Sequence, residues 1–424
     1  MGRILKGEKP ADHPMSKALI IGGSVGGLFA ANMLRSIGWE ATVFERNAEE
    51  LTGRGAGIST HPQLRDVTRR LGIPFDDSMG IHIDTVVFLD HDGRCYDRRA
   101  TVRLMSSWGR VFRSLRDRMP AGSYHLGKSL LRVEQDAGSV TAIFADGTHE
   151  HGDLLIGADG GRSTVRELFL PGQQPDYAGC VAWRAMLDER DVPPAIHEEL
   201  FAHFTYCLPP GELFLAYPVP GRNNETQPGQ RAYNIVWYRP TTPAQLADFC
   251  TDANGKQHGT SIPPPLLRPA IIAWSKAQAR ALVAPQAAEI FERDPRPFFQ
   301  GIFDFISPQI VFGRVALLGD AAFLARPHPG AGTTKCAIDA ECLADSIASL
   351  DLDAGLAKYQ RLQGAFGTGL VRQGQRDGSY LTDQHKPREQ RRNKDMSWDV
   401  DDLMGDHDGR SMQVKRILDE SRRV

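Results

Sequence analysis

Four glycines near the start of the chain stand where a protein could bind a phosphate group. They lie in the segment ALIIGGSVGGLFAANML, residues 18–34, directly after an apolar run. Backbone N–H groups in such a turn, together with the positive end of the helix that follows, attract a diphosphate. The four residues are Gly22, Gly23, Gly26 and Gly27.

The dinucleotide-binding pattern GxGxxG is incomplete here because Ser24 stands at its second glycine position. That glycine normally lets the backbone approach a pyrophosphate with no side chain in the way. Ser24 has a Cβ, so we expect an ordinary negative φ and a slightly wider approach of the backbone. We also expect its Oγ or its N–H to lie within hydrogen-bonding reach of a phosphate.

An acidic residue follows at the spacing at which such turns are paired with a ribose ligand. Glu45 lies 23 residues after Gly22 (45 − 22), at the end of the strand-like segment ATVFER. A carboxylate at this place accepts a hydrogen bond from a ribose hydroxyl. The apolar run 18–22, the helical periodicity up to Gly38 and ATVFER together predict a β-α-β unit.

Two later segments also place a carboxylate in a glycine-rich loop after an apolar strand. The segment DLLIGADGGRSTVR, residues 153–166, contains Asp159. The segment GRVALLGDAAFLARPHPGAGTTKCAIDA, residues 313–340, contains Asp320 and continues into a helical pattern. With the first turn, they predict three loops that could converge on one phosphate-bearing ligand.

Strand and turn signals predict an α/β chain with an inserted domain. We expect residues 16–175 to form the first part of a Rossmann-like domain, with a hairpin near 84–98 that contributes to the second domain. Residues 176–293 are rich in aromatic, strand-like pieces and predict a mostly antiparallel sheet. Residues 294–385 are expected to return to the first domain and to end in helices. The tail, 386–424, has 10 Lys or Arg and 9 Asp or Glu, which predicts a solvated helix or disorder.

Composition excludes several classes of protein. The 50 Lys and Arg nearly balance the 52 Asp and Glu of this 424-residue chain, so nothing favours nucleic acid or an anionic membrane as partner. No segment has the length and apolarity of a membrane span or a secretory signal. The six cysteines lack CxxC spacing, and the tail segment DVDDLMGDHDGR, residues 399–410, lacks the closing Glu of a calcium loop. We expect reduced thiols, no metal and a cytoplasmic location.

The three loop segments, in this order and at this separation, resemble those of the FAD-dependent aromatic hydroxylases, the class A flavoprotein monooxygenases. The resemblance covers residues 16–380. Within the family, YAGCVAWRAML, FLAYPVPG and GDAAFLARPHPGAG are most similar to the 2,6-dihydroxypyridine 3-hydroxylase branch. The resemblance implies a FAD-binding domain of the glutathione-reductase and p-hydroxybenzoate-hydroxylase type, an inserted antiparallel substrate domain and C-terminal helices.

The resemblance also implies an activity. The family hydroxylates electron-rich aromatic rings with noncovalent FAD, NADH or NADPH as reductant and O2, through a C4a-hydroperoxyflavin. For this chain it implies a small aromatic substrate, a hydroxypyridine of the 2,6-dihydroxypyridine type. A homodimer is one expectation, although the sequence leaves both the oligomeric state and the choice between NADH and NADPH open.

By resemblance, individual residues take roles toward FAD. Glu45 would accept a hydrogen bond from the adenosine ribose, Arg46 would lie on the adenosine side, and Asp320 would bind the ribityl or pyrophosphate region. Asp159 would contribute near FAD and NAD(P)H, with Arg166 bracing its loop. Backbone N–H groups at the start of the last helix would face the flavin edge that becomes negative on reduction. The full expected set is Gly22, Gly23, Ser24, Gly26, Gly27, Glu45, Arg46, Arg110, Leu130, Asp159, Asp320, Gly332, Thr333 and Thr334.

The chain departs from the family pattern at several positions. In the third segment, Phe323 replaces the usual His, Arg326 replaces the first of two prolines, and Thr334 replaces the usual Asn. Earlier, Phe112 replaces an arginine that contacts the flavin in many relatives.

The lost arginine has two possible substitutes, since Arg110 and Arg113 both flank Phe112. We assign the role to Arg110 and leave Arg113 as the alternative.

Candidates for the substrate site come from the third segment and the aromatic strands. The carbonyl of Pro327, His328 and Tyr217 are expected to contact the substrate hydroxyl during acid–base chemistry. The expected pocket residues are His61, Trp183, Tyr206 and Tyr217. The alternative for each is structural, because aromatic side chains on strands usually pack in a core.

Two other functions remain open. One is a flavoenzyme of the same fold that acts on another phenolic or heteroaromatic substrate by decarboxylative hydroxylation or epoxidation. A halogenase is disfavoured because no WxWxIP segment occurs. The other is a non-catalytic flavin-binding sensor, which only the charged tail supports.

Overall fold

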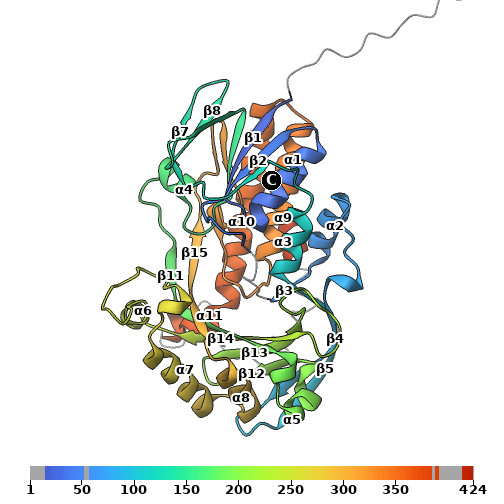
Figure 1. Ribbon diagram of the computed structural model, residues 1–424, viewed down its shortest axis with the longest axis vertical. Coiled ribbons are helices and arrows are strands. Elements are labelled where there is room, and N and C mark those ends of the chain that lie inside the picture. Colours follow the sequence, from blue (N-terminus) through green and yellow to red (C-terminus); the bar gives the residue numbers. More distant parts are fainter. Residues whose placement is uncertain (1–14, 52–56, 384–386, 391–412, 424) are drawn as a thin grey trace, which may run out of the picture.

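Two large sheets lie one above the other along the length of the molecule (Figure 1). The structure is a computed structural model that describes residues 15–51, 57–383, 387–390 and 413–423. The upper sheet is covered by α1 (Val25–Ser36) and α9 (Gly332–Ala348), and the lower sheet by α7 (Pro269–Leu282) and α8 (Pro285–Arg293). Within the part of the chain described, no helix is long and apolar enough to cross a membrane.

The upper sheet has six strands, and those between β17 and β6 run parallel. Its central strands are apolar runs buried on both faces, as expected of a parallel sheet covered by helices. The expected β-α-β unit is present as β1, α1 (Val25–Ser36) and β2. The strand order is β16 (Val311–Phe312), β17 (Val315–Leu317), β10 (Leu154–Gly157), β1 (Lys17–Ile21), β2 (Glu40–Phe44) and β6 (Tyr124–His125).

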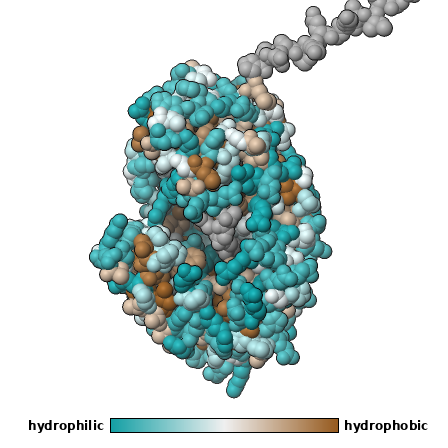
Figure 2. Space-filling model, in the orientation of Figure 1, coloured by the Kyte–Doolittle hydropathy of each residue, from teal (hydrophilic) through white to brown (hydrophobic). Residues whose placement is uncertain are grey.

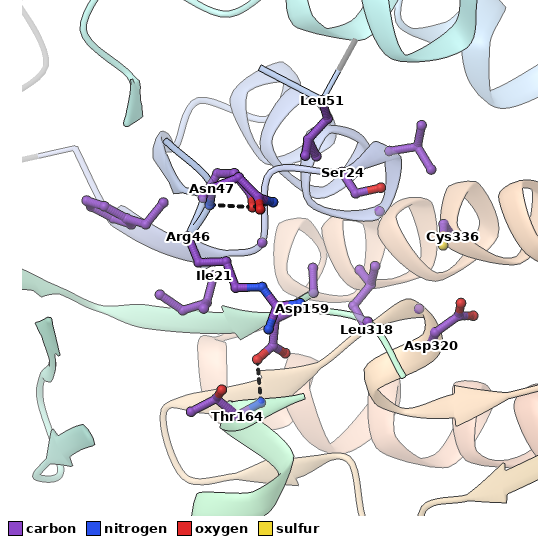
Figure 3. Close-up of a pocket in the computed structure, with 18 of the residues that line it drawn as sticks. Ile21, Ser24, Arg46, Asn47, Leu51, Asp159, Thr164, Leu318, Asp320 and Cys336 are labelled. Carbon is purple, nitrogen blue, oxygen red and sulfur yellow. Dashed lines mark hydrogen bonds between the residues drawn. The ribbon is translucent and has the colours of Figure 1, made fainter. Parts of the chain in front are cut away.

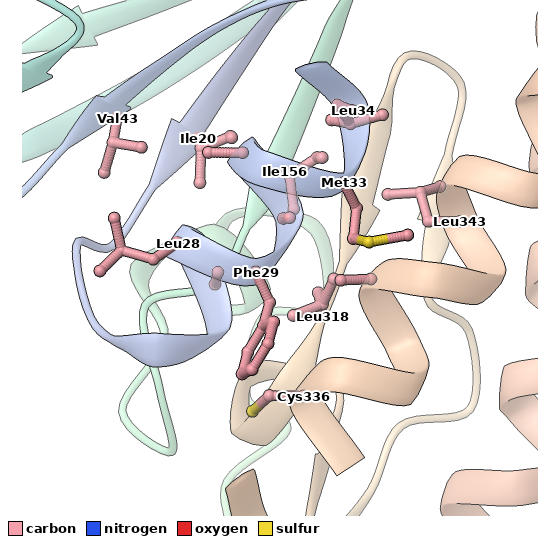
Figure 4. Close-up of a cluster of buried hydrophobic side chains, with 14 of the residues drawn as sticks. Ile20, Leu28, Phe29, Met33, Leu34, Val43, Ile156, Leu318, Cys336 and Leu343 are labelled. Atoms are coloured by element: carbon pink, nitrogen blue, oxygen red, sulfur yellow. The ribbon is translucent and has the colours of Figure 1, made fainter. Parts of the chain in front are cut away.

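Helices α1 and α9 (Gly332–Ala348) pack against each other on this sheet. Figure 4 shows Phe29 and Met33 of α1 meeting Cys336 and Leu343 of α9, with Leu318 beside them. Phe29, Met33 and Leu343 are completely buried. This packing ties the start of the chain to the segment near residue 330, and therefore brings two of the three glycine-rich loops together.

The lower sheet has nine strands and is mostly antiparallel; β12 and β4 form a parallel pair. The expected hairpin near 84–98 is present as β4 and β5, and it joins this sheet. Strands from beyond residue 293 join it too, so the sheet extends past the expected segment 176–293. The strand order is β18 (Phe323–Leu324), β15 (Phe298–Ile306), β11 (Asp176–Asp188), β14 (Ala232–Pro240), β13 (Leu213–Val219), β12 (Phe204–Cys207), β4 (Ile81–Leu89), β5 (Cys95–Ser107) and β3 (Gly57–Ser59).

The nine-stranded sheet is buried on both faces. One face packs against α6 (Pro243–Phe249), α7 (Pro269–Leu282) and α8 (Pro285–Arg293). The other face forms a separate apolar cluster and looks toward the upper domain. Because successive residues of a strand point to opposite faces, the second face determines which side chains can reach a ligand between the domains.

The remaining elements connect and cover the two sheets. A three-stranded sheet contains β7 (Leu130–Gln135), β8 (Val140–Phe144) and β9 (His149–Gly152). The other helices are α2 (Pro62–Arg70), α3 (Trp108–Arg116), α4 (Thr164–Phe169), α5 (Pro194–Ile196), α10 (Leu352–Asp377) and α11 (Ser379–Asp383). Short helical turns are η1 (Asp77–Met79), η2 (Glu189–Asp191), η3 (His197–Phe201), η4 (Pro264–Leu266), η5 (Gly319–Ala321) and η6 (Arg388–Gln390).

The end of the tail packs onto the molecule, which corrects the expectation of a solvated or disordered tail for these residues. Residues 413–421 form a helix whose Val414, Ile417 and Leu418 are buried against Ala331 and Phe366. The three apolar residues share one face because of their i, i+3 and i+4 spacing, which the many neighbouring charges obscured. The expected absence of a metal at 399–410 concerns residues outside the described part of the chain.

We predict that Ile417→Ala loosens this terminal helix, whereas Arg416→Ala does not. Ile417 is 5% exposed, while the Arg416 side chain is 61% exposed. Truncation of a buried Ile costs about 2–5 kcal/mol in a core and an exposed change about 0.5 kcal/mol or less. Hydrogen exchange of the 413–421 amides should therefore accelerate in Ile417→Ala alone. Equal protection in both variants would show that the helix is not held by this face.

Candidate active site

A cavity of about 480 Å³ lies where the parallel strands of the upper sheet end. Its walls come from the residues that follow β1, β2, β10 and β17, which is where ligands bind in open α/β sheets. Figure 3 shows Ser24, Arg46, Asp159 and Asp320 around it. The expected cofactor residues that line it are Gly22, Ser24, Gly26, Glu45, Arg46, Leu130, Asp159, Asp320, Gly332 and Thr333.

Two glycines of the first turn are required by close backbone packing. Gly22 has a φ of 108°, and a Cβ there would lie 2.4 Å from the carbonyl oxygen of Ala158. A Cβ on Gly27 would lie 1.9 Å from the carbonyl oxygen of Gly22. Gly27 therefore shapes the turn from behind and does not line the cavity.

Ser24 has the ordinary backbone conformation expected for it, with a φ of −76°. It is the N-cap residue of α1, but its side chain makes no capping hydrogen bond, and it lines the cavity. The hydroxyl and the first N–H groups of α1 are thus available to an anion. The contact between Ser24 and a phosphate remains a prediction.

Glu45 holds the turn as well as lining the cavity. Its carboxylate is 5% exposed and accepts hydrogen bonds from the N–H of Gly23 at 2.8 Å and of Asn47 at 2.9 Å. The Gly23 carbonyl accepts a hydrogen bond from the Tyr124 hydroxyl at 2.9 Å, so Gly23 is a structural residue outside the cavity lining. A carboxylate has about four lone-pair sites, which leaves acceptor capacity for a ribose hydroxyl.

Asp159 lines the cavity and also caps α4. It accepts hydrogen bonds from the N–H groups of Thr164 at 2.7 Å and Val165 at 3.2 Å. Burial raises the pKa of this carboxyl in spite of these bonds. Arg166, 1% exposed, donates to the carbonyl oxygens of Gly161 and Ala321. It therefore connects this loop to the turn that follows Asp320.

Arg110 lies outside the cavity, contrary to the expectation that it contacts the flavin. Its guanidinium donates to the carbonyl oxygen of Asn224 at 2.7 Å. The cavity side of α3 is taken by Trp108, which stacks on Phe112 with ring centroids 4.8 Å apart. Two residues along a helix correspond to a turn of about 200°, so Arg110 points away from the cavity that Trp108 lines.

Three charged groups meet beside the cavity: the buried Lys335 and Asp339, and the partly exposed Asp320. Lys335 of α9 is 1% exposed, and its Nζ lies 3.4 Å from Asp339 and 3.9 Å from Asp320. Asp339 also accepts the N–H of Gly319 at 2.9 Å. Burial raises the pKa of both carboxyl groups, whereas the Lys335 charge lowers it. Burial would lower the pKa of Lys335, but the carboxylates outweigh it and the pKa is raised.

A second cavity of about 280 Å³ adjoins the first and lies against the nine-stranded sheet. Asp320, Gly332 and Thr333 line both cavities. The amides at the start of α9 also lie here, and no side chain caps them. Thr334, which was also expected at the cofactor, is fully buried and lines neither cavity. The face seen in Figure 2 is hollowed between the two domains.

The sheet wall of the second cavity is aromatic and apolar. Tyr217 stacks on Phe204, with ring centroids 4.6 Å apart, and its hydroxyl donates a long hydrogen bond to the carbonyl oxygen of Gly57 at 3.4 Å. Burial raises the pKa of Tyr217, so the phenol is neutral and can donate a hydrogen bond at neutral pH. Other lining side chains are Leu213, Leu215, Val236, Tyr238 and Leu370.

Three of the four expected pocket residues, Trp183, Tyr206 and His61, do not line this cavity. Trp183 lies on the opposite face of the sheet, packed against Phe249 and Phe299. Tyr206 is fully buried and stacked on Phe88, outside the lining. Successive residues of a strand point to opposite faces of the sheet, which explains the wrong prediction for Trp183. Its neighbour on β11, Arg184, is the residue that lines the cavity.

The histidines and Pro327 lie at the other side of the second cavity. His328 lines it, 5% exposed, with its ring edge against Tyr238. His61 does not line it but contacts the Gly330 carbonyl at 3.3 Å. Pro327 lines it, and its carbonyl oxygen already accepts the N–H of Gly330 at 2.8 Å, with one lone pair remaining.

Sequence reasoning missed two charged residues of the site, Arg184 and Lys335. Alternation along YAGCVAWRAML could have found Arg184, because burial of Trp183 on one face sends its neighbour to the other. Lys335 and Asp339 form an i, i+4 pair inside an otherwise apolar segment, which is a signal for a buried ion pair.

The first cavity fits the dinucleotide part of FAD in position and donor set. Its glycine turn, the uncapped start of α1, the Glu45 carboxylate and Asp320 provide for the diphosphate and the hydroxyl groups of a dinucleotide. The junction with the second cavity, at Gly332 and Thr333, leaves space for a ring system next to the uncapped amides of α9. A bound ring there would be accessible from the sheet side.

Comparisons with known proteins agree with this geometry. Residues 177–304 match a family model described as FAD binding domain-like. The 2,6-dihydroxypyridine 3-monooxygenase of Paenarthrobacter nicotinovorans is 31% identical over 85% of this chain and 88% of that protein. The 6-hydroxynicotinate 3-monooxygenase of Bordetella bronchiseptica is 27% identical over 76% of this chain and 80% of that protein. The solved structure of 2,6-dihydroxypyridine-3-hydroxylase from Arthrobacter nicotinovorans has a TM-score of 0.81 at 30% identity, covering 87% of this chain and 93% of that one.

We predict that Lys335→Met destabilises the protein by about 3–5 kcal/mol at neutral pH, because the buried carboxylate of Asp339 loses its cation. The folded-state pKa of Asp339 should rise further above its unfolded value. A carboxyl group whose pKa is higher in the folded state than in the unfolded state destabilises the folded protein as the pH rises through that pKa. The loss of stability caused by Lys335→Met should therefore be smaller at pH 5 than at pH 8. Denaturant unfolding at both pH values measures it, with Lys335→Arg as the charge-preserving control. A pH-independent defect would contradict this account.

Proposed function

This chain belongs to the class A FAD-dependent aromatic hydroxylases, and we propose that its reaction is the hydroxylation of a hydroxypyridine with NAD(P)H and O2. One oxygen atom of O2 enters the ring and the other leaves as water, while NAD(P)H supplies two electrons. The observation that carries the proposal is the pair of cavities that share Asp320, Gly332 and Thr333. One fits FAD and the other, smaller and aromatic, fits a single ring.

Relatives support the ring class. The two curated relatives described above are named for 3-monooxygenation of 2,6-dihydroxypyridine and of 6-hydroxynicotinate. Both compounds are hydroxylated pyridines. The second cavity of this chain, at about 280 Å³, suits a molecule of that size.

FAD, when bound, supplies the transfer of hydride equivalents and the activation of oxygen. The residues of this chain have the remaining tasks. The apolar wall of Leu213, Leu215 and Val236 excludes water from the ring. The amides at the start of α9 and the Lys335 charge favour negative charge at the junction.

Acid–base groups lie around the second cavity. Tyr217 is a neutral phenol, and its single O–H can exchange the long hydrogen bond to the Gly57 carbonyl for one to a ring oxygen. The Pro327 carbonyl can accept one from a ring hydroxyl, and His328 lies beside it. We propose that these three residues orient the ring and hold its proton during oxygen transfer.

We predict that dihydroxypyridines stimulate oxidation of NADH or NADPH and gain one oxygen atom, detected by mass spectrometry. A panel that also contains phenols, salicylate-like carboxylates and nonaromatic controls separates this activity from other hydroxylations in the family. Failure of every dihydroxypyridine and phenol would contradict the substrate class. Oxidation that no ring compound stimulates, with tightly bound FAD, would favour the sensor.

We predict that Tyr217→Phe lowers kcat/KM about tenfold and diverts reducing equivalents to hydrogen peroxide, because one donor to the ring is lost. Peroxide per NAD(P)H consumed measures the diversion. Tyr206→Phe, a matched change one strand away and outside the cavity, should leave coupling unchanged. The role of Tyr217 is wrong if the two variants behave alike.

A further inference from the structure

The loop that carries Pro327 and His328 is attached to the nine-stranded sheet by a buried ion pair. Arg326, the residue before Pro327, is 4% exposed, and its partner Asp304 of β15 is 6% exposed. The Nε of Arg326 lies 3.1 Å from Oδ1 and 3.0 Å from Oδ2 of Asp304, and Nη2 lies 2.8 Å from Oδ2. Two nitrogens therefore bind one carboxylate, which fixes the orientation of the guanidinium.

Helix α10 adds a third partner to this pair. The side-chain amide of Gln375 donates to the Asp304 carboxylate at 3.3 Å. A Cβ on Gly374 would lie 3.2 Å from the backbone nitrogen of Arg326, so the helix packs closely on the loop. The ion pair thus joins β15, the end of α10 and the loop that follows β18.

The end of the same helix also confines the ring of His328. A Cβ on Gly378, the C-cap residue of α10, would lie 2.4 Å from Nε2 of His328. Tyr238 of β14 contacts the ring as well, with ring centroids 5.0 Å apart. His328 is 5% exposed and lines the second cavity. Its ring therefore has little room to turn.

Only Pro327 separates Arg326 from His328. The ring of a proline restricts its own φ to about −65°. The carbonyl oxygen of Pro327 also accepts the N–H of Gly330 at 2.8 Å, which closes a turn after it. His328 therefore has few free torsions relative to Arg326, and a shift of Arg326 would move His328.

A gain in stability alone does not explain a buried ion pair. The attraction between two buried charges is largely offset by the cost of removing both from water, and apolar residues of similar volume are often as stabilising. Two hydrogen bonds between a guanidinium and a carboxylate do restrict geometry, because they form together in only one arrangement. The pair is thus suited to hold a position.

We propose that Arg326 is a positioning residue for the ring hydroxylation, and that its pair with Asp304 holds Pro327 and His328 at the second cavity. This inference rests on the proposed function and names the residues that hold its acid–base groups in place. Arg326 lines the cavity, but its charge is balanced by Asp304, so it acts through the loop and not on the ring. A displacement of about 1 Å at such a site can cost about a hundredfold in rate.

The main test replaces both partners by apolar residues of similar size, Arg326→Met together with Asp304→Leu. This double variant should melt near the wild-type temperature, because no buried charge is left without a partner. It should nevertheless lower kcat about tenfold to a hundredfold, with little change in KM for the ring, and send more NAD(P)H to hydrogen peroxide. Wild-type kcat and coupling in the double variant would overturn the proposal, because the pair would then be structural only.

The two single variants show whether the pair acts as a unit. Arg326→Met and Asp304→Leu should each reproduce the fall in kcat, and the double variant should not exceed the larger of the two. Both should melt at a lower temperature than the double variant, because each leaves one buried charge unpaired. A fall in kcat with Arg326→Met and none with Asp304→Leu would show that Arg326 acts on the ring itself, which would overturn the proposal.

Arg231→Met is the matched control for a general loss of stability. Arg231 pairs with Glu189, which is 4% exposed, and it lines neither of the two cavities. Its loss should lower the melting temperature, because a buried carboxylate loses its cation, and should leave the coupling unchanged. Equal peroxide formation in Arg231→Met and Arg326→Met would contradict a specific role of Arg326.

Gly378→Ala disturbs His328 while the ion pair stays intact. Gly378 has a φ of −84°, so an alanine fits the backbone and acts through its contact with the imidazole ring. This variant should also raise the share of peroxide. Gly364→Ala, earlier in α10, should not, because its Cβ would lie 3.5 Å from the nearest atom. Normal coupling in Gly378→Ala would show that the end of α10 does not set the position of His328.

A measurement without substrate follows His328 directly. Diethylpyrocarbonate modifies accessible imidazoles, and peptide mapping of the FAD-loaded enzyme compares His328 with the partly exposed His203 in the same protein. Relative to His203, modification of His328 should be several-fold faster in the double variant than in the wild type. An unchanged ratio would overturn the claim that the pair holds His328.

Failure of the inference differs from failure of the proposed function. If the wild type hydroxylates ring compounds and the double variant does so equally well, only the inference is wrong. If no ring compound stimulates NAD(P)H oxidation in the wild type, the proposed function is wrong, and faster modification of His328 in the double variant would still support the holding role of the pair.

Discussion

The site depends most on the interactions of one buried carboxylate, that of Asp339. It accepts the N–H of Gly319 and pairs with Lys335, so it joins the turn after β17 to the start of α9. Because of this link, Asp320 and the first amides of α9 lie where the two cavities meet. An uncompensated carboxylate at that depth would be costly, so the cation and the amide are needed together.

The division of work between the two domains follows from this junction. The parallel strands of the upper sheet end at the first cavity. The lower sheet lines the second cavity with the side chains of one of its two faces. Packing of α1 against α9 fixes the first glycine turn relative to the third loop. The molecule can therefore hold a dinucleotide and a separate small ring side by side with little irregular backbone between them.

Much of this arrangement was readable in the sequence because its signals are local. Glycine turns after apolar strands, Glu45 and Asp320 all indicated the first cavity, and Asp-Gly turns indicated the hairpins. The direction in which a side chain points is harder to predict from sequence. Trp183 is expected in the pocket, although it is its neighbour Arg184 that lines the cavity. Arg110 is expected at the flavin, although α3 turns its side chain away from the cavity. Both errors concern which side of an element points inward, and tertiary packing decides that. For the tail, a solvated helix was one expectation, but the burial of helix 413–421 was not predicted because charges surround its three apolar residues.

We propose that one cavity holds FAD and that the adjoining cavity holds the ring that is hydroxylated. A crystal structure of the protein with FAD and 2,6-dihydroxypyridine tests it most directly. The account predicts the diphosphate at the Gly22–Gly27 turn, the flavin ring at the junction formed by Asp320 and Thr333, and the pyridine against Tyr217. A flavin outside the first cavity, or a pyridine bound away from the nine-stranded sheet, would contradict it.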